Sequence, residues 1–298
     1  MRARSRSFAA DAAVVLLLAL AGPALADPPA TPQRLLLETS RTREAPPLED
    51  ALPEGHALSG KEIYERVLRN RFDAYVQTSS LVSGDRGGSE QESRLSMSWK
   101  SYRDEDDQPT RGILSKTLVK YTHPFDLRFS GYLIVSNHQR HNDQFVYLAS
   151  TRRVRRVNLR GEAVFGTDFT FEDVVPREVE DSTYRRMPDA EVDGVPCFVV
   201  EVTPRAHADS DYSKFVVYVE KEHYVPLRTR YWDDRDLEVK ELRAQHDSIQ
   251  DFGGIFVPLH TTMRNLQLDT YTSLEVQSLE PNPKLRPTDF DLRRLESH

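Results

Sequence analysis

The sequence predicts a mainly β (α+β) protein built on one large curved antiparallel sheet or open barrel. After about residue 72 apolar and polar residues alternate with the period of 2 that is typical of strands. The runs are separated by short polar or glycine-bearing turns. No helical stretch is long enough to connect parallel strands, so an antiparallel meander fits better than βαβ units.

The first 26 residues have the organisation of a cleaved Sec signal peptide. Arg2, Arg4 and Arg6 precede an apolar run over residues 12–21, and Ala24-Leu25-Ala26 supplies the small-x-small cleavage pattern. The run is too short for a bilayer, which takes roughly 20 residues. No cysteine follows the cleavage site to carry a lipid anchor. We therefore expect a periplasmic protein with no lipoprotein anchor.

Residues 27–57 are rich in proline and charge, and we expect a flexible leader there, followed by a single domain over residues 58–298. The net charge of −7 argues against nucleic acid as a partner, because phosphate binding needs clustered Lys and Arg. The single cysteine, Cys197, cannot form an intramolecular disulfide, and its apolar neighbours predict a buried, unreactive thiol.

An amphipathic helix is expected to open the domain. Ser59 and Glu62 have the spacing of a capping box. A single apolar stripe follows at helical spacing, formed by Ile63, Tyr64, Val67, Leu68 and Phe72.

Strands are expected from there to the C-terminal region. In the first hairpin Leu95, Met97 and Trp99 alternate with polar residues. The further expected strands cover residues 112–121, 127–136, 144–148, 153–159, 184–190, 197–203, 214–220, 227–232, 237–249, 256–263 and 271–279.

Several strands carry large apolar residues on both faces. In the strand expected at 127–136, Phe129 and Leu133 oppose Tyr132 and Ile134, and the strand at 214–220 shows the same pattern. Both faces of the sheet should therefore be covered, as in a curved sheet wrapped around a helix or a ligand.

Two motifs resemble a known family. One is Asp143-Gln144-Phe145-Val146-Tyr147-Leu148 continued by Arg153-Val154-Arg155-Arg156-Val157, and the other is Gly166-Thr167-Asp168-Phe169-Thr170-Phe171-Glu172-Asp173-Val174. They are similar to the LolA-like superfamily of outer-membrane lipoprotein-sorting proteins. Phe145 stands where that branch usually has tryptophan, and Ala149-Ser150-Thr151-Arg152 replaces its Pro-Ala-Leu-Gly turn.

The resemblance implies an open, incomplete β-barrel with short helices across its concave face. It also implies a hydrophobic cavity for lipid or lipoprotein acyl chains, with an inner-membrane exporter and an outer-membrane acceptor as partners. We expect a monomer. The candidate cavity residues, chosen by size and strand position, have ordinary core packing as their alternative; they are Trp99, Phe129, Leu133, Phe145, Tyr147, Phe215 and Met263.

The acidic second motif invites a metal or acid/base interpretation, but a structural role is favoured. Thr167 and Asp168 are expected to cap a single helical turn that aromatic residues pin to the sheet. The residues assigned this role are Gly166, Asp168, Phe169, Phe171, Glu172 and Asp173.

A basic cluster follows the first motif, with Arg153, Arg155 and Arg156 at its centre. These side chains divide between two faces of a strand. They are open to three interpretations: ion pairs with the acidic motif, contact with anionic headgroups, or contact with an acidic partner.

The sequence gives no reason to expect an enzyme, a metal site or a cofactor. It contains no G-x-S-x-G, H-E-x-x-H or glycine-rich phosphate loop. His138 and His141 are the nearest approach to a metal pair, without a glutamate or cysteine at ligand spacing. Two functions remain open: a periplasmic carrier or chaperone for lipid or lipidated protein, and a non-enzymatic interaction module or accessory subunit of an envelope export system.

Overall fold

The computed structural model describes residues 57–104, 107–158, 161–208 and 210–297. The predicted signal peptide and all but the last residue of the predicted leader lie outside the described residues. The helical elements are α1 (Gly60–Arg69), η1 (Val179–Asp181), η2 (Ala206–Ala208), η3 (His246–Ser248), η4 (Pro287–Phe290) and α2 (Leu292–Glu296). No helix among the described residues combines the length and apolar character needed to cross a membrane.

The strands form one 13-stranded antiparallel sheet and a separate two-stranded sheet, β12-β13. They are β1 (Ala74–Gly84), β2 (Glu90–Ser101), β3 (Ile113–His123), β4 (Gly131–Asn137), β5 (Asp143–Leu148), β6 (Arg153–Val157), β7 (Ser182–Val192), β8 (Val195–Pro204), β9 (Lys214–Glu220), β10 (Pro226–Trp232), β11 (Glu238–Ala244), β12 (Ile249–Asp251), β13 (Phe256–Pro258), β14 (His260–Asn265) and β15 (Thr270–Pro281). The large sheet confirms the predicted fold class.

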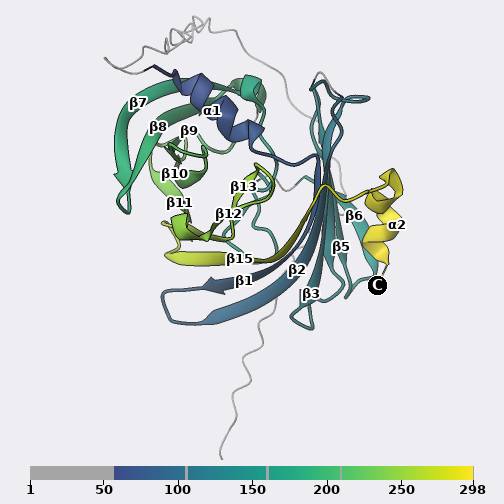
Figure 1. The fold of residues 1–298 in the computed structure, drawn as a ribbon. Coiled ribbons are helices and arrows are strands. Elements are labelled where there is room, and N and C mark those ends of the chain that lie inside the picture. The colour runs from purple at the N-terminus through teal and green to yellow at the C-terminus, as the bar shows by residue number, and fades with distance from the viewer. Residues whose placement is uncertain (1–56, 105–106, 159–160, 209, 298) are drawn as a thin grey trace, which may run out of the picture. The chain divides into compact units, whose positions relative to one another are not determined.

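The large sheet consists of two meanders joined in the middle. Its order is β6-β5-β4-β3-β2-β1-β15-β14-β11-β10-β9-β8-β7, so the meander β1 to β6 meets the later strands where β1 pairs with β15. The sheet curves strongly (Figure 1), and its edge strands, β6 and β7, follow each other in the sequence without pairing. The barrel is therefore open, as expected.

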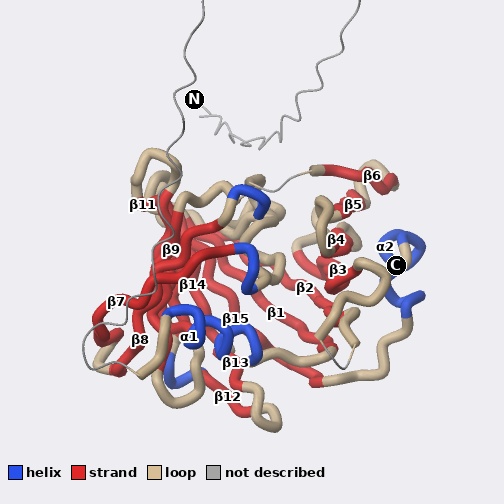
Figure 2. Tube along the Cα trace, turned by 90° about the horizontal axis from the view of Figure 1, so that it is seen from above, coloured by secondary structure: helices blue, strands red, loops and turns tan. Residues whose placement is uncertain are grey.

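Helix α1 covers the inner, concave face of the β7–β11 half (Figures 1 and 2). The predicted capping box is present: the Glu62 N–H donates to the Ser59 hydroxyl at 3.1 Å, and the Ser59 N–H donates to Glu62 Oε2 at 2.8 Å. The helix buries Ile63 and Tyr64. They belong to an apolar group that we call the helix cluster: Ile63, Tyr64, Tyr184, Val200, Val202, Tyr212, Phe215, Val217, Val219, Tyr231 and Met263.

The connection from β6 to β7 covers the inner face of the other half. We call its described residues 161–181 the crossing segment. Apart from η1 it contains only turns and an isolated bridge, Ala163 to Thr170. Phe171 is 2% exposed and packs edge-on against Tyr132 of β4, with ring centroids 5.3 Å apart. The apolar group here, the loop cluster, is Leu81, Leu95, Val119, Tyr121, Tyr132, Ile134, Val164 and Phe171.

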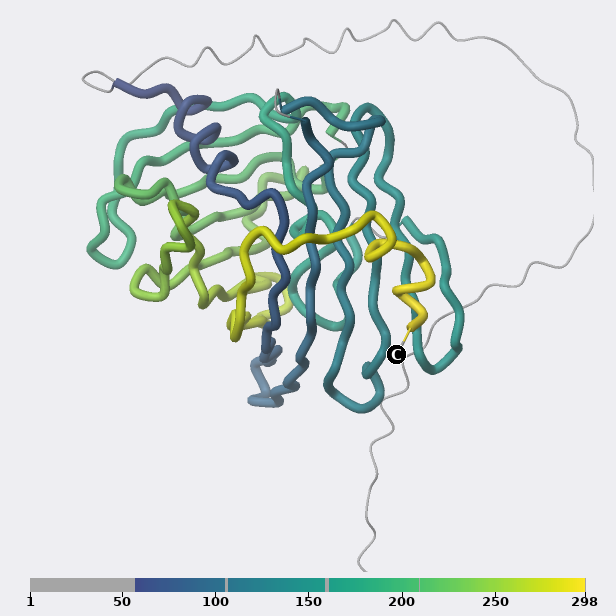
Figure 3. Tube along the Cα trace, turned by 45° about the vertical axis from the view of Figure 1, so that its right-hand side comes forward, coloured from purple at the N-terminus to yellow at the C-terminus, as the bar shows by residue number. Residues whose placement is uncertain are grey.

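The C-terminal residues cover the outer, convex face of β3 to β6 (Figure 3). After β15 the chain runs across the strands and ends in η4 and α2, whose Phe290 and Leu295 are fully buried. Together with Leu118, Leu133 and Tyr147 they form the outer cluster. Both faces of β4 are thus covered, as its sequence predicted, and protein side chains supply both covers.

The outer face of the other half carries ion pairs beside a small apolar group, Val192, Cys197 and Leu227, on which Tyr218 packs. Arg185 pairs with Glu201 at 2.8 Å, and Arg243 donates to Glu241 at 2.8 Å. On β9 the outward Tyr218 lies under the guanidinium of Arg228, 5.5 Å from the ring centroid. The two-sided apolar pattern of β9 therefore combines burial under α1 with arginine stems outside.

Several strand boundaries were predicted wrongly: residues 237–249, expected as one strand, form β11, η3 and the start of β12, and residues 256–263 form β13 and part of β14. The error that affects a candidate cavity residue is at β4. Strand β4 begins at Gly131, so Phe129 precedes it and lies in a turn with a positive φ of 70°. The strand approaches its neighbour closely at Gly131, where a Cβ would lie 2.1 Å from the Val119 carbonyl oxygen. The turn also includes Pro124, which ends the pairing of β3.

The outer cluster yields a test of the C-terminal cover. Leu295→Ala should lower the free energy of unfolding by about 2–5 kcal/mol, because it leaves a cavity at a fully buried site. Leu292→Ala on the same helix is the matched control, since Leu292 is 41% exposed, and should change stability by less than about 0.5 kcal/mol. Urea unfolding measures the free energy of unfolding of both variants. Equal effects would show that α2 does not hold the outer face.

Candidate functional site

The crossing segment is fixed to the sheet by a buried ion pair. Lys240 Nζ of β11 lies 2.9 Å from Asp173 Oδ2, with the two side chains 9% and 2% exposed. The same carboxylate accepts hydrogen bonds from the Thr170 N–H, the Thr170 hydroxyl and the Tyr212 hydroxyl, each at 2.8 Å. Burial, and then Asp173, raise the pKa of Tyr212, so the phenol stays protonated and donates. Asp173 therefore has four donors, three on Oδ2 and one, the Tyr212 hydroxyl, on Oδ1.

Glu172 makes a second attachment beside it. Its Oε1 lies 3.2 Å from Arg177 Nη2 and accepts from the Ser210 hydroxyl, while its Oε2 accepts from the Asp211 N–H at 2.9 Å. The crossing segment is thereby joined to the β8–β9 connection. Arg177 also lies over the ring of Phe215, 4.6 Å from its centroid.

Asp168 makes the third attachment. Its carboxylate accepts from the hydroxyls of Thr270 and Thr272 on β15, and its N–H donates to Thr272 Oγ1 at 2.9 Å. Gly166 before it has a φ of 79°, a conformation that favours glycine. Phe169 packs against the helix cluster, and Phe171 lies in the loop cluster.

The acidic motif forms the predicted single turn, but Thr167 and Asp168 do not cap it. A single hydrogen-bonded turn does form, from the Asp173 N–H to the Thr170 carbonyl at 3.1 Å. Asp173 caps this turn, whereas the Thr167 hydroxyl donates to the Val164 carbonyl at 2.8 Å. Asp168 bonds to β15 instead, because the sheet provides hydroxyl donors that the sequence of the motif does not reveal.

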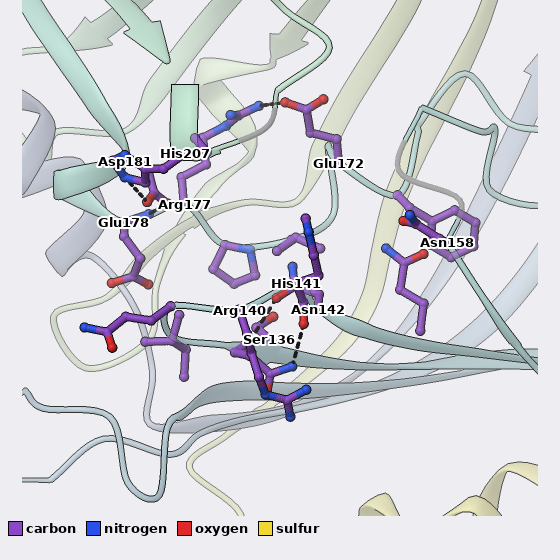
Figure 4. A pocket seen from close by; sticks show the side chains of 18 residues that line it. Ser136, Arg140, His141, Asn142, Asn158, Glu172, Arg177, Glu178, Asp181 and His207 are labelled. Atoms are coloured by element: carbon purple, nitrogen blue, oxygen red, sulfur yellow. Dashed lines mark hydrogen bonds and ion pairs between the residues drawn. The ribbon is translucent and has the colours of Figure 1, made fainter. Parts of the chain in front are cut away.

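A pocket of about 600 Å³ lies between the crossing segment and the loop of the β4–β5 hairpin (Figure 4). The crossing segment contributes Arg177 and Glu178, and the hairpin contributes Arg140, His141 and Asn142. Asn142 Oδ1 accepts from the Asn137 N–H at 2.9 Å, which closes the hairpin loop.

The ionised side chains around this pocket are paired. Glu172 binds Arg177, Asp181 Oδ1 lies 3.5 Å from His207 Nε2, and Glu178 binds Arg103. Arg140 Nη2 lies 2.9 Å from Asp143. Burial raises the pKa of Glu178 against the opposing effect of Arg103. The pocket therefore presents hydrogen-bonding groups without a large excess of either charge.

The structure does not gather the seven candidate cavity residues around one space. Phe215 and Met263 lie in the helix cluster on the inner face. Trp99 lies on the same face and stacks on Tyr75, with ring centroids 5.6 Å apart. Phe129 lies in its turn beneath Arg128. The other three, Leu133, Phe145 and Tyr147, pack in the outer cluster against the C-terminal segment.

The basic cluster lies on β6, an edge strand. Arg153, Arg155 and Arg156 are exposed, and Arg156 pairs with Asp143 of β5. In the part of the chain that the structure describes, the acidic motif takes its basic partners elsewhere, from Lys240 and Arg177. Arg160, a further arginine of this cluster in the sequence, lies outside the described residues.

Two further expectations concern Cys197 and possible metal ligands. Cys197 is fully buried beside Val192 and Leu227, and burial raises the pKa of its thiol to about 11, as expected for an unreactive cysteine. Within the described ranges no group of three or more His, Cys, Asp or Glu side chains is placed to hold a metal ion. His141 is instead part of the pocket wall.

Sequence reasoning missed the pocket because its walls come from distant segments. Ser136, Arg177 and His207 are brought together only by the crossing segment and by the curvature of the sheet. The one signal in the sequence is the polar run His138-Gln139-Arg140-His141, which supplies Gln139, Arg140 and His141 to the pocket wall.

Comparison with known sequences identifies a family for this chain. A family model described as "Uncharacterized protein" matches residues 114–297, which is more than half of the chain. The chain belongs to this family. None of the curated proteins matches it in sequence.

Solved structures show that the family member described here has a LolA-like fold. A putative outer membrane lipoprotein-sorting protein domain from Vibrio parahaemolyticus superposes with a TM-score of 0.71 at 22% identity, over 80% of this chain and 98% of that one. A DUF1329 family protein from Desulfovibrio piger superposes with a TM-score of 0.72 at 22% identity, over 79% of this chain and 98% of that one. A LolA superfamily protein from Nitrosomonas europaea superposes with a TM-score of 0.61 at 16% identity, over 79% of this chain and 98% of that one.

The buried ion pair of the crossing segment can be tested directly. Asp173→Asn should lower the free energy of unfolding by about 3–5 kcal/mol, because it leaves Lys240 charged and buried without its partner. Asp193→Asn is the control: Asp193 is 77% exposed and lies 3.2 Å from Arg243, and such surface pairs contribute about 0–1 kcal/mol. Chemical denaturation gives both values.

A double-mutant cycle with Lys240→Met separates the pair from the other contacts of Asp173. The double variant should be more stable than Asp173→Asn alone, because it removes the unpaired charge. If Asp173→Asn and Asp193→Asn cost the same, the ion pair does not fix the crossing segment.

Proposed function

We propose that this protein is a non-enzymatic periplasmic carrier that shields the acyl chains of lipids or lipidated proteins between envelope membranes. The observation that carries the proposal is the apolar inner face beneath α1. Val200, Phe215 and Met263 are each at most 2% exposed there, in the cluster to which α1 contributes Ile63 and Tyr64. If α1 moved aside, the strands would offer a continuous apolar surface.

An acyl chain supplies the physical reason for such a surface. Each CH₂ group left in water costs about 0.8 kcal/mol, so a carrier must cover most of a chain. An apolar strand face can do this for chains of different length, because apolar contacts are not directional. Phe215 and Met263 of the predicted cavity set form the floor of the proposed site, and Trp99 continues it along the inner face.

The sequence supports the rest of the proposal. The predicted export signal of residues 1–26 favours the periplasm, where an inner-membrane exporter would supply the cargo and an outer-membrane acceptor would receive it. The exposed Arg153 and Arg155 would contact anionic headgroups or an acidic partner at the membrane surface.

A second candidate is an interaction module that carries no mobile ligand. It is favoured by a specific observation: protein side chains fill the inner face, with Ile63 of α1 at 0% and Phe171 of the crossing segment at 2% exposure. The two candidates differ in whether α1 yields to an acyl chain.

Loosening α1 distinguishes them. Ile63→Ala should weaken the packing of the helix by about 2–5 kcal/mol. If an acyl chain competes with α1 for the strands, a larger open population binds a fluorescent fatty acid several-fold more tightly. Arg69→Ala is the control, since the Arg69 side chain is 78% exposed on the same helix, and should leave the affinity unchanged. Near-ultraviolet circular dichroism confirms that each variant is folded.

The native cargo can be read in parallel by mass spectrometry of organic extracts from protein purified from the periplasm. Stoichiometric lipid supports the carrier and gives the class of its cargo. Absence of lipid, together with no fatty-acid binding by either wild type or Ile63→Ala, would reject the carrier in favour of the interaction module.

A further inference from the structure

A small inner chamber adjoins the polar pocket. Trp99, Ser115 and Ser136 lie in its wall, and it shares Ser136 and Glu178 with the larger pocket. Its volume is about 20 Å³, which is enough for roughly one water molecule or one hydroxyl group of a ligand. The chamber and the pocket therefore lie side by side on the inner face, and we refer to the two together as the hollow.

Four buried polar atoms along this hollow have no hydrogen-bond partner among the described residues. They are Trp99 Nε1, Ser115 Oγ, Ser136 Oγ and Asn137 Oδ1. Each of these residues is more than nine-tenths buried. Buried polar groups in folded proteins are nearly always paired, so four exceptions in adjoining positions indicate a missing hydrogen-bonding molecule.

The register of the sheet explains why the hollow exists. Ser101, Ser115 and Ser136 are consecutive cross-strand partners on β2, β3 and β4, so they lie on one face. In the next row Trp99 pairs with Thr117. Small hydroxyl side chains thus replace the large residues that fill the inner face elsewhere, and the stacking of Trp99 on Tyr75 keeps the indole beside the space.

The chemistry of the hollow selects the ligand class. Trp99 donates only, Asn137 Oδ1 accepts only, and the serine hydroxyls do both. The carboxylates and the arginines of the wall are already paired with each other, so the hollow has no excess of positive charge for a phosphate and no wholly apolar wall for an acyl chain. A neutral molecule with several hydroxyl groups satisfies both the donors and the acceptors.

We infer that this hollow binds a sugar ring, with one ring hydroxyl in the inner chamber between Trp99 Nε1 and the two serines. The pocket volume of about 600 Å³ lies within the usual range for small-molecule sites. The sugar is either the headgroup of a glycolipid or a free saccharide. The glycolipid source rests on the proposed carrier function, whereas the free saccharide does not.

Tryptophan fluorescence tests this directly. The chain has two tryptophans, so Trp232→Phe leaves Trp99 as the sole reporter. That protein is titrated with glucose, galactose and N-acetylglucosamine, and separately with detergent micelles that contain glucosyl-diacylglycerol, diacylglycerol or phosphatidylglycerol. We expect a saturable change in Trp99 emission with at least one sugar-bearing probe, and binding at least tenfold weaker for the matched lipid without sugar.

A serine variant separates the ligand from a structural role. In the Trp232→Phe background, Ser115→Ala with Ser136→Ala should weaken sugar binding at least tenfold and leave the thermal midpoint unchanged, since neither hydroxyl holds the free protein together. Ser130→Ala is the matched control: Ser130 is 1% exposed, and its hydroxyl accepts from the Ala149 N–H at 3.0 Å. It should lower the midpoint and keep the sugar affinity.

The alternative outcomes are separable. No emission change with any sugar-bearing probe overturns the inference, as does a lowered midpoint of the double serine variant without sugar binding, which would mean that the chamber holds an ordered water only. Equal binding of glycolipid and sugar-free lipid, with no response to free sugars, also overturns it but leaves the carrier intact. Free-sugar binding without acyl-chain uptake supports the inference and rejects the carrier.

Discussion

The buried pairing of Asp173 with Lys240 is the contact on which the arrangement of the inner face depends. The connection between β6 and β7 must cross an apolar surface with little secondary structure of its own, so its polar groups need partners from elsewhere. Asp173, Glu172 and Asp168 supply them by binding β11, the β8–β9 connection and β15, respectively. These attachments let Phe171 enter the loop cluster and hold Arg177 and Glu178 at the pocket.

The same segment accounts for the open barrel. The edge strands β6 and β7 are linked by the crossing segment and share no ladder of hydrogen bonds. Each edge has features that discourage pairing with another chain. Strand β6 is five residues long and carries exposed arginines, and β7 contains Pro188 at an irregularity in its pairing between Met187 and Ala190. The sheet can therefore end at both edges without recruiting a partner strand.

Local signals in the sequence were sufficient for much of the fold. The Ser59 to Glu62 capping box and the stripe after it located α1, and the alternation of side chains located most strands. The resemblance of the 143–157 and 166–174 motifs identified the fold family. These predictions succeeded because each depends on residues that are neighbours in the chain. Phe129 was misplaced because only the approach of Gly131 to the Val119 carbonyl sets the start of β4.

The candidate site was harder because it depends on which distant residues cover which face. Leu133 and Tyr147 have the size and strand position of cavity residues, yet Phe290 and Leu295, more than 140 residues later, pack over them. Likewise, nothing in the sequence near Ser136 indicates that its hydroxyl has no partner. Periodicity predicts that a residue is buried, and only tertiary structure shows whether a side chain or a ligand buries it.

Arg177 links the apolar and polar parts of the inner face. Its guanidinium borders the pocket and also lies over Phe215, which belongs to the helix cluster beneath α1. Arg177 thus contacts both the cluster and the pocket. A molecule that displaced α1 from the strands would have its polar end next to Arg177 and Ser136, and its apolar part along Phe215 and Met263. If the proposed carrier function holds, an amphiphile with a hydroxyl-rich headgroup would satisfy both environments at once, whereas a simple fatty acid would leave the four unpaired atoms without partners.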